Sequence, residues 1–343
     1  MNEISLYNVC DFIEKSGTTL ILGHYSPDGD CLGSAFALAE MIRMCGGQAE
    51  VGCDGKVPER LMFMCDGVLT PDTVNVGKFD SIISVDVASP SQLGGFDTLI
   101  PKIALMIDHH GMGEPFADNY IDSSAAAAGE IVYRIYKELL FRGSIKQNPR
   151  TLRFIYAAIV SDCGSFKFSN TTPSTMAVGA ELLANINNAH DGGLSTSDIS
   201  RLLFGRFSVR EMTAKMVAIQ NMRFYENGRM CAVMFSSEIL KQYGLDESDI
   251  GNAVDTPRCI DGVLVALSVR QTGEKSYKVS SRANVDIDCA AVCAQFGGGG
   301  HTRAAGCSLE ADTPEDALET AAEAFGNAVR EYAEKITDEK ARI

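Results

Sequence analysis

Short apolar runs alternate with helical patterns along the first half of the chain, and this alternation limits the fold more than any other feature. The short runs, rich in β-forming residues, span residues 18–23, 49–53, 79–87 and 102–107. Helical spacing of apolar residues is found at 31–44, 126–141, 149–160 and 173–185. Strands that alternate with helices predict an α/β domain with a doubly wound parallel sheet. Sites in such folds lie at the carboxyl ends of the strands.

The chain has 343 residues, which indicates two domains. We expect the doubly wound domain over residues 1–195, a linking helix over 196–222, and a smaller C-terminal α/β domain over 223–343. The second domain shows strand patterns at 230–235, 263–270 and 277–282, and a further short strand after 297–300. Thr313 and Pro314 are typical of the start of a final helix that runs to about residue 336.

The composition is that of a globular protein, with 45% hydrophobic and 22% charged residues. No run approaches the roughly eighteen apolar residues of a membrane-spanning helix, and the first residues lack the pattern of a signal peptide. The eleven cysteines are odd in number and form no Cys-x-x-Cys pair. We therefore interpret them as reduced thiols of a cytoplasmic protein, not as disulfides or a zinc ribbon.

The net charge is -15, so the surface as a whole repels a long nucleic acid, which needs many phosphate contacts at once. Residues 258–306 differ from this average, because they hold six Lys or Arg against four acidic residues. A small anionic substrate is therefore compatible with the sequence.

The loop after the first predicted strand carries His24, Asp28 and Asp30 within seven residues. Pro27 and Gly29 favour a tight turn, which lets the three polar side chains converge. This density is typical of a metal site. Acidic residues that cap the following helix explain the loop about equally well when it is taken alone.

Other acidic residues and histidines follow later elements. Asp86 ends the third predicted strand, and Asp162 ends a helical run; each alone would be a cap or turn residue. Asp108, His109 and His110 end the fourth strand, where two adjacent histidines are hard to explain by packing.

Taken together, these positions lie at one face of a single α/β unit, where a doubly wound sheet places its site. Two histidines and four aspartates there suit two divalent ions. Mixed carboxylate and imidazole ligands favour Mn²⁺, with Mg²⁺, Co²⁺ or Fe²⁺ as alternatives, whereas an all-carboxylate site would favour Mg²⁺ more strongly.

The same segments resemble the motifs of the DHH phosphoesterases, in the family's order along nearly the whole chain. The similar segments are HYSPDGDCLGS from residue 24, SVDVASPSQLG around residue 86, Asp108-His109-His110, VSDCGSFKFSNTT around residue 162, and GGGGHTRAAG from residue 297. The length and two-domain layout look most like the NrnA-type nanoRNases, which are bifunctional oligoribonucleases and phosphatases of 3'-phosphoadenosine 5'-phosphate (pAp). The resemblance implies hydrolysis of phosphoesters with two Mn²⁺ ions.

The resemblance also implies roles for the residues of these motifs. His24 and Asp28 would bind one ion, and Asp30 and His109 the other. Asp86 would bridge the two ions, and Asp162 would belong to the shared centre. Asp108 would hold the ring of His109 through its free nitrogen. His110 would face the substrate phosphate and stabilise charge or protonate the leaving oxygen.

The glycine run before His301 is a second candidate site. Gly298, Gly299 and Gly300 allow close approach of a ligand, and consecutive N–H groups bind anions, although a flexible tight turn is the simpler explanation. We expect Arg282 and His301 to contact the terminal phosphate or the base of the substrate. Arg270, near the end of a neighbouring strand, is a weaker candidate.

The sequence thus predicts a hydrolase for short 5'-phosphorylated RNA, the dinucleotide pApA and pAp, with no partner among long nucleic acids or membranes. The alternatives are a class II inorganic pyrophosphatase, a RecJ-like single-strand exonuclease, and a nucleotide-binding regulator without turnover. The glycine motif argues against the pyrophosphatase, and the complete set of ligand candidates argues against the regulator. The oligomeric state stays open, with a homodimer among the alternatives.

Overall fold

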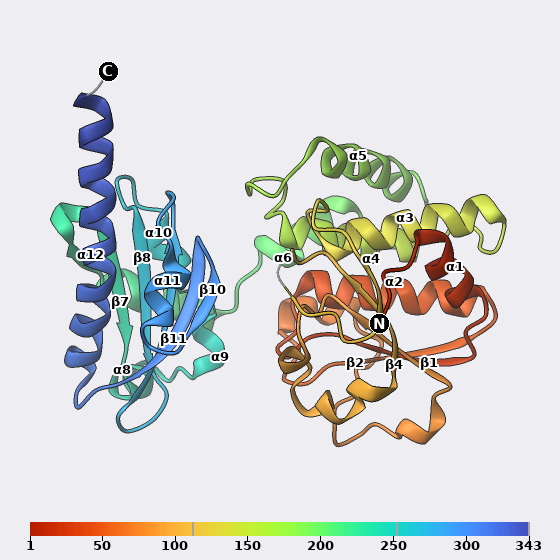
Figure 1. Ribbon diagram of the computed structural model, residues 1–343, viewed down its shortest axis with the longest axis horizontal. Helices are drawn as coiled ribbons and strands as arrows, with labels where there is room; N and C mark the ends of the chain where they lie inside the picture. Colours follow the sequence, from red (N-terminus) through yellow and green to blue (C-terminus); the bar gives the residue numbers. More distant parts are fainter. Residues whose placement is uncertain (112, 252, 342–343) are drawn as a thin grey trace. The chain divides into compact units, whose positions relative to one another are not determined.

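The computed structural model describes residues 1–111, 113–251 and 253–341 (Figure 1). The chain divides by its internal contacts into two compact units, residues 1–206 and 207–343. Each unit has its own sheet and its own hydrophobic core, and each is described separately below.

Unit 1 is built on a five-stranded sheet with the order β2-β1-β3-β4-β5. The strands are β1 (Thr18–Leu22), β2 (Gln48–Gly52), β3 (Ser81–Val85), β4 (Ile103–Asp108) and β5 (Asp118–Ile121). Every neighbouring pair is parallel. All five carboxyl ends therefore lie along the same edge of the sheet.

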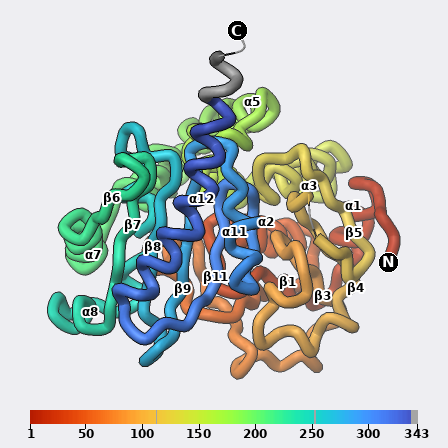
Figure 2. Tube along the Cα trace, turned by 60° about the vertical axis from the view of Figure 1, so that its left-hand side comes forward, coloured from red at the N-terminus to blue at the C-terminus, as the bar shows by residue number. Residues whose placement is uncertain are grey.

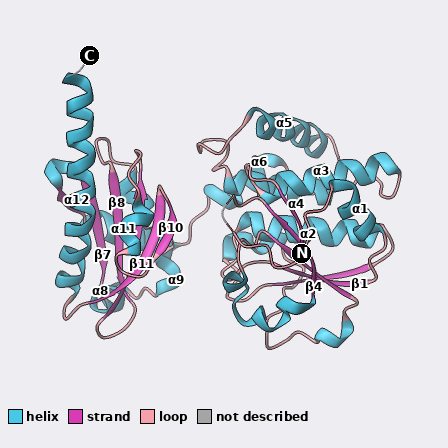
Figure 3. Cartoon of the chain, viewed as in Figure 1, coloured by secondary structure: helices cyan, strands magenta, loops and turns pink. Residues whose placement is uncertain are grey.

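Helices cover both faces of this sheet, as expected for a doubly wound fold (Figure 3). One face packs against α-helices, which are α1 (Leu6–Glu14), α2 (Gly29–Met44), α3 (Ala128–Arg142), α4 (Pro149–Asp162), α5 (Pro173–Asn187) and α6 (Thr196–Phe204). The other face packs against the 3₁₀ segments η2 (Val76–Lys78) and η3 (Pro90–Lys102), whereas η1 (Glu59–Met64) joins the first core. Apolar residues of one strand alternate between the faces, as Ile21 and Leu22 do, so the predicted α/β sheet is confirmed.

Two glycines let three helices approach closely around Ala158 of α4. A Cβ added to Gly33 of α2 would lie 2.6 Å from the carbonyl oxygen of Phe154, and one added to Gly129 of α3 would lie 2.6 Å from the Cβ of Ala158. Any larger residue would push α4 outward. This packing fixes the end of α4, where Asp162 lies.

Unit 2 contains a six-stranded sheet with the order β10-β11-β9-β8-β7-β6. Its strands are β6 (Arg223–Tyr225), β7 (Met230–Phe235), β8 (Val265–Gln271), β9 (Ser276–Ala283), β10 (Gly299–His301) and β11 (Ala304–Glu310). The pair β7 and β8 is parallel, and the other neighbouring pairs are antiparallel.

The two faces of the second sheet are covered unequally. The long helix α12 (Pro314–Ala341) and the short α11 (Cys289–Ala294) pack on one face, where α12 runs lengthwise over the strands (Figure 2). The opposite face is covered at β7 and β8 by α7 (Val209–Gln220), α8 (Ser237–Tyr243), α9 (Glu247–Ile250) and α10 (Asp255–Arg258). On that face the side chains of β9 and β11 are half-buried or exposed.

The single linking helix expected over residues 196–222 is wrong, because the structure has two helices there. Helix α6 ends at Phe204 with Gly205 as its C-cap. Helix α7 begins after Ser208, whose side chain accepts a hydrogen bond from the backbone of Glu211 while Glu211 accepts one from Ser208. This capping box starts a new helix, and the boundary between the two units lies in the break.

The N-terminal signal for the last helix is confirmed. The hydroxyl of Thr313 accepts a hydrogen bond from the backbone N–H of Asp316 at 3.1 Å.

Within the described part of the chain, no helix has the length and apolar character needed to span a bilayer. All eleven cysteines are free thiols.

Candidate metal centre

Histidines and aspartates meet at the carboxyl edge of the first sheet. Strand β1 is followed by His24 two residues after its end, strand β3 by Asp86, and strand β4 ends in Asp108 before His109 and His110. Because these strands are parallel neighbours, the residues that follow them lie close together.

The first turn of α2 contributes two carboxylates with different environments. Asp28 is the N-cap, and its Oδ1 accepts hydrogen bonds from the backbone of Asp30 and Cys31. Asp30 is 1% exposed. Its carboxylate accepts hydrogen bonds from the backbone N–H groups of Ala128 and Gly129 at 2.7 and 2.8 Å, and from the hydroxyl of Ser34. The start of α3 therefore fixes the orientation of Asp30.

His24 and His109 are oriented in the same way. Nδ1 of each ring faces a backbone carbonyl, that of Tyr25 at 2.9 Å for His24 and that of Ala125 at 3.4 Å for His109. Nε2 of each ring then faces carboxylates. Ring nitrogens held by a backbone carbonyl are typical of histidines that bind metal through the other nitrogen.

The distances from these Nε2 atoms to carboxylate oxygens are longer than hydrogen bonds. His24 Nε2 lies 3.7 Å from Asp28 and 3.6 Å from Asp86. His109 Nε2 lies 3.5 Å from Asp86, 3.7 Å from Asp162 and 3.8 Å from Asp30. The donor atoms thus face one another without direct bonds, as ligands of a shared ion do.

The donor atoms form three groups, and the atoms within each group lie within 4.8 Å of one another. They are His24 with Cys31 and Asp86, Asp86 with His109 and His110, and Asp30 with His109 and Asp162. Asp86 and His109 each belong to two groups, so they connect the three. Among the described residues, Asp28 belongs to none of these groups, although it lies 3.7 Å from His24.

Asp86 has the environment of a metal ligand. Its φ is 58°, in the left-handed region that few residues other than glycine adopt. The side chain is 3% exposed, and within the described residues its Oδ1 has no hydrogen-bond partner. A buried carboxylate oxygen without a partner is costly unless a cation neutralises it. The residues present therefore fit divalent ions.

The protonation equilibria show how strongly these groups interact. Burial lowers the pKa of His24, but the carboxylates of Asp28 and Asp86 outweigh it and raise the pKa to about 10. Burial also lowers the pKa of His109, but the carboxylates of Asp86, Asp30 and Asp162 raise it to about 10. Burial raises the pKa of Asp162 to about 6, with a further contribution from the charge of Asp86. So dense a cluster of carboxylates needs positive charge nearby.

Asp108 contacts a different histidine from the one expected. Its Oδ1 accepts a hydrogen bond from Nδ1 of His110 at 2.7 Å, and it reaches His109 only through the backbone N–H. The ring of His109 is held by Ala125 instead. The expectation that Asp108 holds the His109 ring is therefore wrong, and the reason is local. His109 points toward Asp30 and Asp162, whereas His110 turns back toward Asp108.

Two features of the centre were missed in the sequence. One is the start of α3, where Ala128 and Gly129 hold Asp30; a glycine followed by the buried Glu130 was a weak signal for it. The other is Cys31, which looks like an ordinary core residue in an apolar helical pattern.

The glycine run of unit 2 is not the loop that the sequence suggested. Gly299, Gly300 and His301 form strand β10, which pairs with β11 in a hairpin. A Cβ on Gly298 would lie 2.3 Å from the carbonyl oxygen of Gly306, and one on Gly300 would lie 2.6 Å from that of Ala304. These two glycines are needed for close strand packing, whereas Gly299 has open space beside it.

The register of the second sheet brings two of the predicted substrate residues together. His301 pairs with Ala304, and Ala304 pairs with Arg282. Residues paired in this way point to the same face, so His301 and Arg282 flank the small Ala304 on the uncovered part of the sheet.

Arg270 lies elsewhere. It pairs with Lys278, four residues from Arg282 along β9, which is about 13 Å at strand spacing. Since β8 and β9 are antiparallel, the C-terminal end of β8, which carries Arg270, lies far from the C-terminal end of β9, which carries Arg282. Arg270, the weaker of the two predicted arginines, therefore lies away from the glycine segment; it is partly buried, and burial lowers its pKa.

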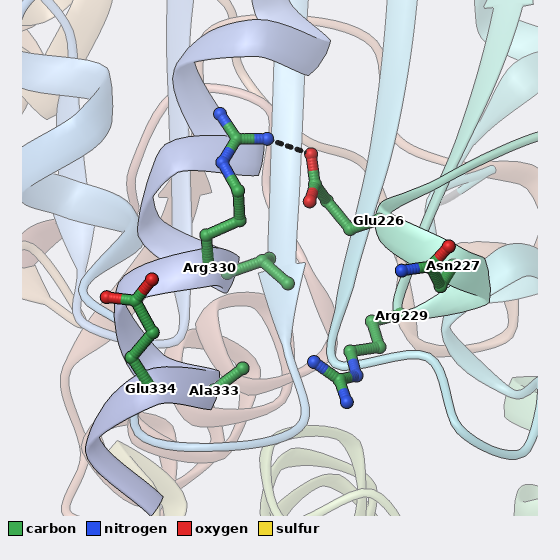
Figure 4. Close-up of a pocket in the computed structure, with 7 residues that line it drawn as sticks. Glu226, Asn227, Arg229, Arg330, Ala333 and Glu334 are labelled. Carbon is green, nitrogen blue, oxygen red and sulfur yellow. Dashed lines mark hydrogen bonds and ion pairs between the residues drawn. The ribbon is translucent and has the colours of Figure 1, made fainter. Parts of the chain in front are cut away.

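A separate hollow of about 390 Å³ in unit 2 lies between η4 (Glu226–Gly228) and α12 (Figure 4). Arg330 in this hollow forms an ion pair with Glu226. Arg229 and Glu334 also line it, so it has both charges and no excess of either. It contains none of the predicted substrate residues.

Comparison with known proteins agrees with the geometry. Residues 18–159 match the model of the DHH family, N-terminal domain, and residues 228–331 match the DHHA1 domain. This chain is a DHH-family protein. The matched N-terminal segment contains every strand of the first sheet and all the centre's histidines, and the DHHA1 segment contains β10 and β11.

Two known proteins resemble this chain over most of its length. It is 27% identical over 311 residues to the bifunctional oligoribonuclease and PAP phosphatase NrnA of Thermus thermophilus, covering 90% of this chain and 89% of the relative. The NrnA protein of Bacillus subtilis is 27% identical over 298 residues, covering 85% and 89%.

A solved structure shares the fold. The crystal structure of an exopolyphosphatase-related protein from Bacteroides fragilis matches with a TM-score of 0.83 and 21% identity, over 95% of this chain and 96% of that one. At this level of identity the likeness concerns the fold alone.

Proposed function

We propose that this DHH-family protein is a metal-dependent phosphoesterase that hydrolyses short 5'-phosphorylated oligoribonucleotides, pApA and pAp. The observation that carries the proposal is the convergence of His24, Asp30, His109 and Asp162 around the buried Asp86, whose Oδ1 has no hydrogen-bond partner among the described residues. The names of the NrnA relatives support this class of substrate.

Two divalent ions of the Mn²⁺ class fit the donor atoms of the centre, since both imidazole nitrogens and carboxylate oxygens are present. Such ions, when bound, would supply an activated water and neutralise charge on the phosphate. Asp86 would be the shared ligand, because it belongs to two donor groups. His24, with Asp28 nearby, would complete one position, and Asp30, His109 and Asp162 the other.

His110 would act on the substrate rather than as a principal metal ligand. Its Nδ1 is occupied by Asp108, which directs the other ring nitrogen away from that carboxylate. A protonated imidazole held in this way is suited to donate to a phosphoryl oxygen or to the leaving oxygen. Asp108 would keep the ring oriented and protonated, because their hydrogen bond raises the pKa of His110.

The second unit would bind the nucleotide. Arg282 and His301 share the open face of its sheet, with only the small Ala304 between them. An arginine and a histidine on an otherwise polar surface match a terminal phosphate or a base edge. We therefore assign metal binding to the domain over 1–195 and substrate binding to the domain over 223–343.

Two further expectations belong to this proposal. A cytoplasmic location agrees with the free thiols of the chain, and a homodimer stays a prediction.

The experiment compares four substrates with one enzyme preparation containing Mn²⁺. We expect phosphate release from pAp and cleavage of a 5'-phosphorylated RNA dinucleotide, with little activity on pyrophosphate or on long single-stranded DNA. Rapid pyrophosphate hydrolysis would favour the pyrophosphatase alternative. Activity mainly on the long strand would favour the RecJ-like alternative, and binding of pAp without turnover would favour the regulator.

A further inference from the structure

The thiol of Cys31 lies at the metal centre. Cys31 directly follows Asp30 in the first turn of α2, and its side chain is fully buried. Its sulfur forms a group with a ring nitrogen of His24 and a carboxylate oxygen of Asp86, and these atoms lie within 4.8 Å of one another. An imidazole and a carboxylate are unusual neighbours for a cysteine that only fills a core.

The absence of a side chain at Gly23 lets the sulfur of Cys31 lie beside His24. A Cβ at residue 23 would lie 2.2 Å from the sulfur of Cys31 and 2.9 Å from that of Cys53. The thiol of Cys31 therefore rests against the backbone at the end of β1, one residue before His24. Any other residue at position 23 would displace it.

The environment of Asp86 independently indicates a cation site beside His24. Its Oδ1 is buried and, within the described residues, lacks a hydrogen-bond partner. Its Oδ2 lies 3.6 Å from Nε2 of His24, too far for a hydrogen bond. The nitrogen, oxygen and sulfur donors thus converge beside a buried carboxylate oxygen that has no hydrogen bond within the described residues.

We propose that the Cys31 sulfur is a third ligand, with His24 and Asp86, of the ion at this position, and that it makes the position prefer Fe²⁺, Co²⁺ or Zn²⁺ over Mn²⁺ and Mg²⁺. The sulfur–metal bond forms as the S–H proton leaves to solvent. Thiolates are soft ligands and select softer ions than carboxylates do. The inference rests on the proposed function only in requiring an ion beside His24.

Cys53 provides a matched control. Its sulfur also lies against Gly23, yet it belongs to none of the donor groups of the described residues. Cys259 is the one exposed cysteine of the eleven, all of which lie in the described part of the chain. A Cys259→Ser parent therefore removes the thiol most open to adventitious metal.

The test adds Co²⁺ to the metal-free Cys259→Ser parent and records absorption in the near ultraviolet, where a cobalt–thiolate bond gives a sulfur-to-metal charge-transfer band. We expect the band in the parent and with Cys53→Ser, and its loss with Cys31→Ala and Cys31→Ser. We also expect the preference for Zn²⁺ over Mn²⁺ to fall by roughly tenfold or more in Cys31→Ala, but not in Cys53→Ser.

The parent protein decides the question even if a variant fails to fold. Co²⁺ bound by the parent without the band would overturn the inference and leave the phosphoesterase proposal intact. A band that persists in a folded Cys31 variant would also overturn the inference. A parent that binds no Co²⁺ and hydrolyses no pAp with any divalent ion would overturn both.

Discussion

The carboxylate of Asp108 accepts a hydrogen bond from Nδ1 of His110 at 2.7 Å, at the end of strand β4. Asp108 is 1% exposed, and its Oδ1 also accepts the backbone N–H of His109. One buried carboxylate therefore positions both histidines that follow it, one through its ring and the other through its backbone.

Replacing His110 by Ala tests whether it acts on the substrate. If His110 stabilises the transition state, His110→Ala should lower kcat by roughly 10²- to 10⁴-fold while KM changes little. Bound metal should stay near the wild-type amount, because His24 and His109 keep the carboxylates around them. Steady-state kinetics and elemental analysis of the same preparation measure both quantities. Loss of metal from this variant would contradict the assignment.

Asp108→Asn tests the positioning role through pH. The carboxylate raises the pKa of His110, so the ring keeps its proton to a higher pH than an ordinary histidine. Activity that needs this proton falls as pH rises through that pKa. Without the charge of Asp108 the pKa drops, and the fall in kcat should move to lower pH. An alkaline limb at the same pH in both proteins would show that Asp108 has only a structural part.

Asp86→Asn tests the shared ligand without disturbing the backbone. Asparagine tolerates the positive φ at this position better than alanine does, and it keeps the size of the side chain. We expect a folded protein that binds less metal and has no measurable turnover. Circular dichroism confirms the fold and elemental analysis counts the ions. A variant with wild-type metal content and activity would remove Asp86 from the centre.

Arg282→Ala tests the substrate face of unit 2, with Lys278→Ala as its control on the same strand. Loss of a charge-assisted hydrogen bond should weaken binding of a 5'-phosphorylated dinucleotide by about 1.5 to 3 kcal/mol. Lys278 lies four residues away, beside Arg270, and its removal should change binding much less. Neither variant should change metal content.

Hydrolysis of 5'-phosphorylated RNA of increasing length tests whether the negative charge of the protein favours short substrates. A net charge of -15 makes each added phosphate of a long strand repulsive, so kcat/KM should be highest for about two to five nucleotides. In the earlier comparison, an equal loss of dinucleotide binding in Arg282→Ala and Lys278→Ala would argue against Arg282 as a specific contact. A steady rise in kcat/KM with length would argue against the short-substrate account.

The elements around the centre could be predicted because their signals are local. Apolar runs that end at His24, Asp86 and Asp108 fix both the strands and the edge of the sheet that carries the site. The helix start at Asp28 follows from an acidic cap next to glycine. Such features depend on a few adjacent residues, which the sequence contains in full.

The remaining features depend on tertiary contacts. Asp108 accepts a hydrogen bond from the ring of His110 and not from that of His109, because the ring of His109 faces the buried carboxylate of Asp30. The break between α6 and α7 depends on a glycine cap and a capping box that interrupt a continuous helical pattern. Arg270 and Arg282 both lie near strand ends, and only the antiparallel pairing shows that these ends are far apart.

The most direct test of the account is a titration of metal-free protein with Mn²⁺, following hydrolysis of pAp and the number of ions bound in the same samples. We predict no activity in the absence of metal and full activity when two ions are bound per chain, with Asp86→Asn inactive throughout. Full hydrolysis of pAp by protein that elemental analysis shows to be free of metal would contradict the central claim.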